Sequence, residues 1–264
     1  MGPSPQELLE IARHAAEAGG EIVARSAGRP LAGETKGAGD YVTEVDRASE
    51  QTIRDLLAAE TPDIPVLAEE AGGAAAERRW VVDPLDGTTN HLHGFPIVGV
   101  SVALVESGRP SVGAVHAPFL AETSVAHRGA GAWLLRPGAE PRALRVSDRA
   151  PAQAVVGTGF PFRTRAAVPR YLAMFERCFE RFEDLRRPGA ASLDLAWVAA
   201  GVFDGFFELN LSPWDVAAGA LLIEEAGGVV TDWEGGDGWL ETGDILAGPP
   251  AVHSALLQLA RSGR

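Results

Sequence analysis

The chain has 264 residues, of which 46% are hydrophobic, and a formal net charge of −13 at pH 7. This length and apolar content can bury a full core, whereas the negative charge argues against direct binding to nucleic acid or to an anionic membrane surface. The single cysteine, Cys178, excludes an internal disulfide, and its place in an apolar helical pattern predicts a packed thiol rather than a nucleophile.

The N-terminal third predicts two helices and two buried strands. Apolar residues recur at helical spacing over residues 5–26 and Ala48–Glu60, and the Gly-rich, polar residues 30–40 between them predict a loop. The short apolar runs Ile64–Ala68 and Trp80–Val82 each end in acidic residues and predict buried strands. The N-terminal residues lack the basic start and the apolar core of a signal peptide, so we expect a cytoplasmic protein.

The next segment predicts an antiparallel meander, because short β-rich runs alternate with Gly-containing turns. The expected strands are Ile97–Val105, Ser111–His116, Thr123–His127 and Ala132–Leu135. Even the longest apolar run, Ile97–Val105, is far too short to span a bilayer, so no membrane partner is expected.

Strands and helices alternate in the C-terminal part. The expected strands are Val155–Gly157, Phe206–Leu209, Gly228–Asp232 and Ile245–Ala247, and the expected helices are 166–182, 190–203, 215–226 and 250–261. This order predicts an α+β half over residues 1–145 and an α/β half over residues 146–264, joined in one compact unit.

The segment Trp80–Asn90, with the sequence WVVDPLDGTTN, carries the strongest chemical signal. An apolar strand ends at Asp83, and Asp86 follows on a turn that Pro84 restricts. Two carboxylates on one rigid turn can bind a hard divalent cation, and the Leu85 carbonyl between them is a third possible ligand.

The same turn continues into a candidate phosphate site. Gly87 permits close approach of the backbone to a ligand, and the Gly87 and Thr88 amides can hold a phosphate if they open a helix. The alternative is an ordinary Asp/Gly/Thr turn, which would explain an isolated Asp-Gly pair but not this whole string behind a buried strand.

Three further segments carry acidic residues that could belong to the same site. Glu69 and Glu70 follow a buried apolar run, where they could be surface acids; beside a metal turn, Glu69 becomes a candidate further ligand and an orienter of the attacking water. Asp215 and Asp46 each stand near a predicted helix start, where either could be an N-cap. In the functional interpretation, Asp215 faces the metals because small residues let its helix pack closely, and Asp46 orients the hydroxyl of Thr88.

Together these segments resemble the inositol monophosphatase family. The family pattern is matched by Trp80–Asn90, by the upstream Glu69-Glu70 pair and by Trp214–Gly219, in the right order and over nearly the whole chain. The resemblance implies a layered α-β-α-β-α sandwich of the sugar-phosphatase type. It also implies a homodimer, magnesium dependence and, in many members, sensitivity to lithium.

The resemblance also implies roles for individual positions. Two or three Mg²⁺ ions would be bound by Glu69, Asp83, the Leu85 carbonyl, Asp86 and Asp215. The substrate contacts would be Asp86, Gly87, Thr88, Gly189, Ala191, Glu208 and Asp215, with the polyol hydroxyls at Gly189, Ala191 and Glu208. The catalytic residues would be Glu69, Thr88 and Asp46, with Glu70 behind them.

Several positions depart from the family pattern without changing a metal ligand. His91 stands where Phe is common, Ala68 replaces Gly or Ser, and Ser212 replaces a Lys whose charge would lie near the site. His91, His93 and His116 form no spaced set of the kind that binds transition metals, so no catalytic role is assigned to them.

The expected reaction is magnesium-dependent hydrolysis of a small phosphorylated polyol, first of all myo-inositol monophosphate, by metal-activated water. Fructose 1,6-bisphosphate and histidinol phosphate are alternative substrates. Relatives that act on histidinol phosphate or adenosine bisphosphate often have Lys at the position of Thr89, which favours the inositol phosphate branch.

Two other classes compete with this interpretation. Haloacid dehalogenase-like phosphatases use the first Asp of Asp-x-Asp-Gly-Thr as a covalent nucleophile, but this chain has one more residue between Asp83 and Asp86. The non-enzyme alternative is a regulatory binding protein of the same fold, since some bacterial relatives associate with the transcription machinery. Such a role need not keep the metal ligands, and here they are intact.

Overall fold

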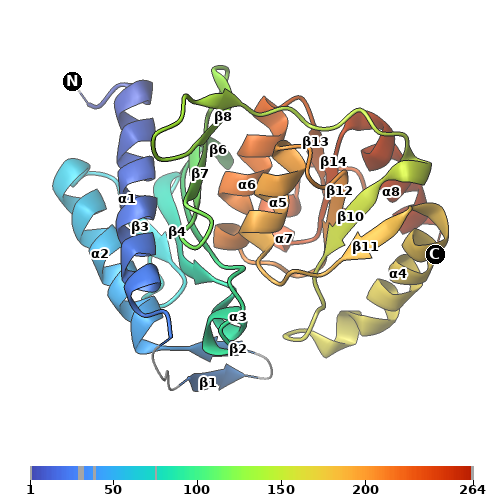
Figure 1. The fold of residues 1–264 in the computed structure, drawn as a ribbon, viewed down its shortest axis with the longest axis horizontal. Coiled ribbons are helices and arrows are strands. Elements are labelled where there is room, and N and C mark those ends of the chain that lie inside the picture. The colour runs from blue at the N-terminus through green and yellow to red at the C-terminus, as the bar shows by residue number, and fades with distance from the viewer. Residues whose placement is uncertain (1, 29–32, 38–39, 75, 263–264) are drawn as a thin grey trace.

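The computed structural model describes residues 2–28, 33–37, 40–74 and 76–262. Two large β-sheets and three layers of helices alternate across the molecule (Figure 1). α1 (Pro5–Arg25) and α2 (Glu44–Glu60) cover the outer face of the first sheet. α5 (Ala191–Ala199) and α6 (Pro213–Glu225) lie between the sheets. The expected layered α-β-α-β-α sandwich is therefore confirmed.

The first sheet has seven strands in sequence order, of which the first two are parallel and the others antiparallel. They are β3 (Val66–Ala68), β4 (Arg78–Asp86), β5 (Gly99–Glu106), β6 (Arg109–Ala117), β7 (Glu122–His127), β8 (Gly131–Leu135) and β9 (Arg142–Ala143). The predicted meander is present. β4 is longer than predicted because its pairing with β5 shifts register between Asp83 and Asp86 and continues beyond Val82.

The second sheet has five strands in the order β11-β10-β12-β14-β13. They are β10 (Val155–Thr158), β11 (Asp184–Arg186), β12 (Gly205–Glu208), β13 (Val229–Thr231) and β14 (Ile245–Gly248). β10 runs parallel to β11 and β12, and β14 is antiparallel to β12 and β13. The sequence did not predict β11, because this edge strand has only three residues and two of them are exposed.

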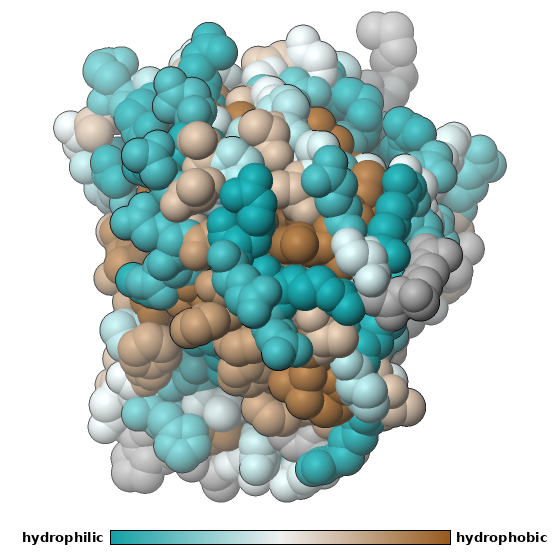
Figure 2. Space-filling view, turned by 90° about the vertical axis from the view of Figure 1, so that its right-hand side faces the viewer, coloured by the Kyte–Doolittle hydropathy of each residue, from teal (hydrophilic) through white to brown (hydrophobic). Residues whose placement is uncertain are grey.

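The remaining helices are α3 (Thr88–Leu92), α4 (Val168–Arg181), α7 (Trp239–Thr242), α8 (Pro250–Arg261) and the 3₁₀ turns at Pro151–Gln153 and Arg165–Ala167. α4 and α8 form the outermost layer, on the far face of the second sheet (Figure 1). Hydrophobic groups interrupt the hydrophilic surface on this side of the molecule (Figure 2), and on α4 the side chains of Leu172 and Phe179 are 55% and 73% exposed. Across the described residues, every helix is too short or too polar to cross a membrane.

The helix predicted over 190–203 ends at Ala199, and the helix predicted over 215–226 begins at Pro213. Two further predictions, both in the N-terminal part, were wrong. α2 begins at Glu44 rather than Ala48, because the Thr43 hydroxyl accepts hydrogen bonds from the Val45 and Asp46 amides and caps the helix there. The predicted loop contains a hairpin of β1 (Glu34–Gly37) and β2 (Asp40–Val42). Positions 30–32, 38 and 39 of that predicted loop lie outside the described residues.

Glycine and alanine allow the central helices to approach their neighbours closely. A Cβ atom on Gly219 of α6 would lie 2.5 Å from the Leu195 Cβ of α5, and one on Gly113 of β6 would lie 3.0 Å from the Ala218 Cα of α6. α6 is thus pressed against both its partner helix and the first sheet. This agrees with the prediction that the small residues after Asp215 serve close packing.

The substitution Gly219→Ala tests this packing. Replacing a helical glycine by alanine normally stabilises a helix by about 1 kcal/mol, but overpacking costs roughly 1–3 kcal/mol, and the 2.5 Å approach to Leu195 makes the second effect larger. We expect a lower free energy of unfolding by urea denaturation. A variant at least as stable as the parent would show that α5 and α6 separate freely.

Candidate active site

A pocket of about 470 Å³ is lined by segments that come from both sheets. The first half of the chain supplies the end of β4 and the start of α3, the helix that follows it. The second half of the chain supplies residues 159–164, the start of α5, the end of β12 and the start of α6. Strand ends and helix starts therefore surround one cavity, which is lined by most of the residues that were expected to bind metal or substrate or to take part in catalysis.

Three aspartates meet in this pocket. One carboxylate oxygen from each of Asp83, Asp86 and Asp215 lies within 4.8 Å of the others. Their exposed fractions are only 1%, 9% and 6%. β4 positions Asp83 and Asp86, and the first turn of α6 positions Asp215.

Backbone amides and a hydroxyl hold each carboxylate in place. The Leu85 amide donates to Asp83 at 3.0 Å, and the Ser212 amide donates to Asp215 at 2.7 Å. The amide and hydroxyl of Ser192 donate to Asp86 at 2.7 and 2.6 Å. Asp215 is the third residue of its helix and not the N-cap, a position that Ser212 occupies.

Burial dominates the electrostatics of the three aspartates. It raises the pKa of Asp86 to about 6 against the opposing hydrogen bonds from Ser192. Burial and then the charge of Asp86 raise the pKa of Asp215 to about 6. Burial, followed by the charges of Glu69, Asp86 and Asp215, raises the pKa of Asp83 well above its usual value. Three ionised carboxylates at this separation repel one another unless positive charge lies among them.

The donor set fits a hard divalent cation. Mg²⁺ prefers oxygen ligands and is commonly held by a few carboxylates. Here the carboxylates are already gathered, and burial raises the pKa of each, an effect that a bound cation would oppose. Leu85, whose carbonyl was expected to be a ligand, also lines the pocket.

Thr88 and Asp46 meet although they are distant in sequence. The Thr88 hydroxyl lies 3.0 Å from an Asp46 carboxylate oxygen and 3.1 Å from the Leu85 carbonyl oxygen, and can donate to either. The other Asp46 oxygen accepts from the Thr43 amide at 2.9 Å. Asp46 lies in the first turn of α2 rather than before it, because the helix starts earlier than predicted. The expected pair is thus within hydrogen-bond distance.

Glu69 and Glu70 point to different places. Glu69 lines the pocket and raises the pKa of Asp83 and Asp86, but it lies outside the 4.8 Å group of aspartates. Its carboxylate lies 3.9 Å from the Arg163 guanidinium. Glu70 lines a separate shallow pocket together with Arg47 and Glu50.

Glu50 is a site-supporting residue that the sequence did not reveal. Its side chain is buried in α2, and its two carboxylate oxygens accept the Glu70 and Ala71 amides at 2.8 and 2.9 Å. It therefore fixes the turn that follows Glu69. The available signal was a charged residue one helical turn after Asp46, on the buried face of the same helix.

The expected substrate positions also line the pocket. They are Gly87, Thr88, Gly189, Ala191 and Glu208. Gly87 has a φ of 88°, which favours glycine, and a Cβ atom there would lie 3.0 Å from the Ile97 carbonyl oxygen. Burial, followed by the charge of Asp215, raises the pKa of Glu208 to about 8.

Positive charge in the pocket comes from arginines that were not predicted. Arg163 and Arg187 both line it, so the serine at position 212 does not leave it without cations. The Arg187 guanidinium stacks over the rings of Phe160 and Phe162, at 5.2 and 5.6 Å from their centroids. The sequence signal was the run Phe160–Arg163, whose aromatic residues lie outside the apolar pattern of any element.

Asp194 is another pocket residue that was missed. It is 1% exposed in the apolar helix α5, and its Oδ1 has no hydrogen-bond partner among the described residues. Burial, followed by the charges of Asp86 and Glu208, raises its pKa well above the usual value. The signal was an acidic residue within a continuous apolar helix.

The histidines and the cysteine have structural surroundings. His91 is buried and lies 2.8 Å from the Ser26 hydroxyl, while His116 lies 2.9 Å from the Thr123 hydroxyl. Cys178 is a buried free thiol, as predicted, and burial raises its pKa to about 12. A thiol with this pKa is protonated at neutral pH and is a poor nucleophile.

Known proteins match nearly the whole chain. The sequence model of the inositol monophosphatase family matches residues 4–263. The Nus factor SuhB of Pseudomonas aeruginosa is 46% identical, over 96% of this chain and 95% of the relative. The structure of the extragenic suppressor protein SuhB of Bartonella henselae is 37% identical with a TM-score of 0.90, over 97% and 99% of the two chains. An inositol monophosphatase structure from Anabaena is 35% identical with a TM-score of 0.84, over 97% and 96%.

The support that Glu50 gives to the Glu69 turn can be tested by Glu50→Gln. The amide nitrogen of Gln would face a backbone N–H and lose one of the two hydrogen bonds. We expect magnesium affinity, measured by isothermal titration calorimetry, to fall by roughly tenfold, as is typical when support behind a metal ligand is lost. The exposed Glu60→Gln on the same helix is the matched control, and equal affinities for the two variants would contradict the role of Glu50.

The raised pKa values predict how pH affects stability without divalent cations. Asp86 and Asp215 bind protons up to about pH 6 in the folded state but only to about pH 4 when unfolded, so stability should fall as pH rises from about 4 to 7. Bound magnesium should offset this loss. We expect millimolar MgCl₂ to raise Tm more at about pH 7.5 than at about pH 5.

Asp215→Asn is the control for this pH effect. Its neutral side chain should reduce both the loss of stability on raising the pH and the increase of Tm by magnesium. An increase of Tm that is the same at both pH values, and is unchanged in the variant, would show that magnesium binds elsewhere.

Proposed function

Since this chain belongs to the inositol monophosphatase family, we propose that it is a magnesium-dependent phosphatase of small phosphomonoesters, with myo-inositol monophosphate as the first candidate substrate. The observation that carries the proposal is the buried group of Asp83, Asp86 and Asp215 beside the Thr88–Asp46 pair in one pocket. Residues of these types in one cavity can bind cations, hold a phosphate and orient a water molecule.

In this proposal Asp83, Asp86, Asp215, Glu69 and the Leu85 carbonyl hold two or three magnesium ions. When bound, Mg²⁺ supplies a Lewis acid that makes water more acidic and offsets negative charge on the phosphate. The carboxylates hold the cations in a largely buried pocket, where such charge interactions are strong because water screens them little.

The water molecule is positioned by Thr88, Asp46 and Glu69. When the Thr88 hydroxyl donates its hydrogen to Asp46, its oxygen lone pairs remain free to accept a hydrogen bond from water. Glu69 takes the proton as the water oxygen attacks phosphorus and the bond to the leaving oxygen breaks. The leaving alkoxide takes a proton from a solvent water molecule and Glu69 returns its proton to solvent, so that the products are an alcohol and inorganic phosphate.

The substrate is held at two ends. The amides of Gly87 and Thr88 bind the phosphate, and Gly189, Ala191 and Glu208 contact the hydroxyls of the polyol. Supporting this division, Glu208 and Ala191 lie in the second half of the chain and line the same pocket as Thr88. The homodimer that the family resemblance implies is part of the same proposal.

A second candidate function rests on the names of relatives. Proteins 42–46% identical to this chain are named Nus factors, which points to a role with the transcription machinery. Such a role is one of binding and does not require hydrolysis. Its specific prediction is that variants of the acidic cluster keep their binding partner while losing phosphatase activity.

The proposed reaction is tested by phosphate release with and without magnesium. The panel comprises inositol 1-phosphate, fructose 1,6-bisphosphate, histidinol phosphate and adenosine bisphosphate. We expect the highest kcat/KM with inositol 1-phosphate and no release after chelation. A preference for another panel member would change the substrate but leave the chemistry in place.

Asp83→Asn and Asp215→Asn separate the mechanisms. Each should lower kcat/KM by at least about a hundredfold, because each removes a charged cation ligand. Full activity in both variants would contradict the site. Recovery of a phospho-aspartate at Asp83 after rapid quenching would support a covalent nucleophile and exclude direct attack by water.

A further inference from the structure

One wall of the pocket is formed by the last residue of β12 and the short segment that follows it. Glu208, Leu209, Asn210 and Leu211 all line the cavity. Asn210 has a φ of 60°, in the left-handed region that few residues other than glycine and asparagine adopt readily. Such a turn needs external support if the side chain of Glu208 is to stay in one place.

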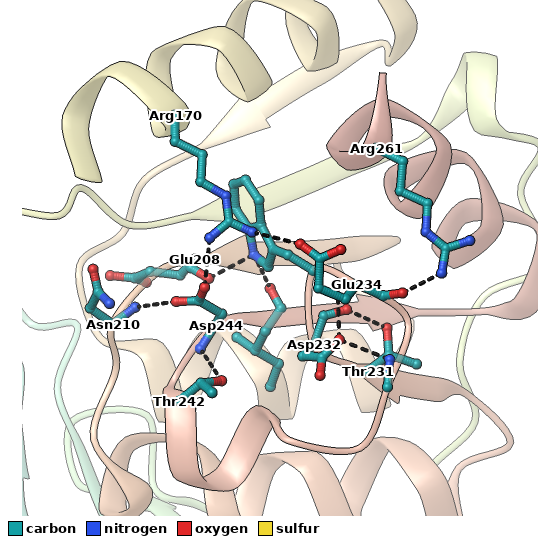
Figure 3. Close-up of polar contacts among 12 residues, drawn as sticks. Arg170, Glu208, Asn210, Thr231, Asp232, Glu234, Thr242, Asp244 and Arg261 are labelled. Carbon is teal, nitrogen blue, oxygen red and sulfur yellow. Dashed lines mark hydrogen bonds and ion pairs between the residues drawn. The ribbon is translucent and has the colours of Figure 1, made fainter. Parts of the chain in front are cut away.

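That support comes from a polar network behind the wall (Figure 3). One carboxylate oxygen of Asp244 accepts the Asn210 amide at 3.1 Å, and the other accepts the Arg170 guanidinium at 2.9 Å. Asp244 itself lies just before β14, where its own amide donates to the Thr242 hydroxyl at 3.2 Å. One side chain therefore connects the wall to α4 across the end of the second sheet.

The same network reaches Glu208 by a second route. The Trp233 indole N–H lies 3.0 Å from the Glu208 carbonyl oxygen and 3.2 Å from the Ile245 carbonyl oxygen. The Arg170 guanidinium lies over the Trp233 ring, 4.9 Å from its centroid. Arg170 is itself held by Asp244 and by Glu234, at 2.9 and 3.5 Å (Figure 3).

On the cavity side, the side chain of Glu208 is closely packed against Gly159. A Cβ atom on Gly159 would overlap the Glu208 carboxylate, so this side chain lies directly against the backbone of the opposite segment. A small displacement of the wall would either drive the carboxylate into Gly159 or pull it away from the cavity. The position of Glu208 is therefore sensitive to what holds the wall from behind.

We propose that Asp244 is a positioning residue that sets specificity for the non-phosphate part of the substrate by holding the Glu208–Leu211 wall. The proposal rests on the proposed phosphatase function, in which Glu208 contacts polyol hydroxyls. Asp244 does not line the cavity, so it acts only through Asn210 and through Arg170 with Trp233.

The backbone hydrogen bonds that lead from the wall to the acidic cluster do not use the side chain of Asp244. The Leu211 amide donates to the Gly243 carbonyl at 3.0 Å, which anchors the chain before it enters α6. The Ser212 amide then holds Asp215 at 2.7 Å. Loss of Asp244 should therefore move the wall more than the residues that would bind cations and phosphate.

The test compares Asp244→Ala with Asp244→Asn on two substrates with magnesium. Inositol 1-phosphate needs the wall, whereas p-nitrophenyl phosphate has no hydroxyls for it to recognise. For Asp244→Ala we expect KM for inositol 1-phosphate to rise by roughly tenfold with kcat within about twofold, and the constants for p-nitrophenyl phosphate to stay within about twofold. Asp244→Asn keeps an oxygen for the Asn210 amide and should recover most of the KM.

Two further variants serve as a negative and a positive control. Asp237→Ala makes the same change at an exposed residue of the preceding loop. Asp237 forms an ion pair of 3.3 Å with the exposed Arg109, and the variant should leave all constants unchanged. Gly159→Ala displaces the Glu208 carboxylate directly and should reproduce the selective rise in KM. Equal losses on both substrates in Asp244→Ala, or no loss on either, would overturn the proposal.

Hydrogen exchange gives a readout that does not depend on activity. The Asn210 amide, which donates to Asp244, should exchange at least about tenfold faster in Asp244→Ala than in the parent or in Asp237→Ala. Unchanged exchange would show that Asp244 does not hold the wall, whatever the kinetics. If the parent protein hydrolyses neither substrate, the proposed function is contradicted, and with it the role of Asp244 in specificity. Hydrogen exchange of the Asn210 amide would still show whether Asp244 holds the wall.

Discussion

Mutual repulsion among three buried carboxylates is the constraint around which this molecule is arranged. Oxygens of Asp83, Asp86 and Asp215 lie within 4.8 Å of one another, and burial raises the pKa of each. Such a group is unfavourable as three free charges, because desolvation and repulsion act together. A divalent cation bound among the three carboxylates, as in the proposed function, would offset this repulsion.

The acidic group exists only because α6, from the second half of the chain, packs against the first sheet. β4 carries Asp83 and Asp86, whereas α6 carries Asp215, and the close contact of Gly219 with α5 brings α6 into position. Ser192 at the start of α5 donates two hydrogen bonds to Asp86. Asn90 adds a further link, since its side-chain amide donates to the Ile97 and Pro188 carbonyls at 2.7 and 2.9 Å.

α2 acts as a rigid support behind the site. Three residues on its buried face contact three different parts of the machinery: Asp46 accepts from the Thr88 hydroxyl, Ser49 donates to the Pro84 carbonyl, and Glu50 accepts the amides after Glu69. Residues three and four apart on a helix share a face, so one element orients all three. On the opposite side, the Arg170, Trp233 and Asp244 network performs the corresponding task for the wall at Glu208.

The amino-acid sequence by itself determined the local chemistry. The spacing in Trp80–Asn90 predicted a strand that delivers Asp83 and Asp86, and apolar periodicity predicted most helices and strands, because both depend on residues close together in the chain. The tertiary structure alone decided which distant groups meet. Ser192 reaches Asp86 across 106 positions, and Asn210 reaches Asp244 across 34. Contacts of this kind leave no period in the sequence, since they arise only when the sheets and helices pack, and they hold both the acidic cluster and the wall in place.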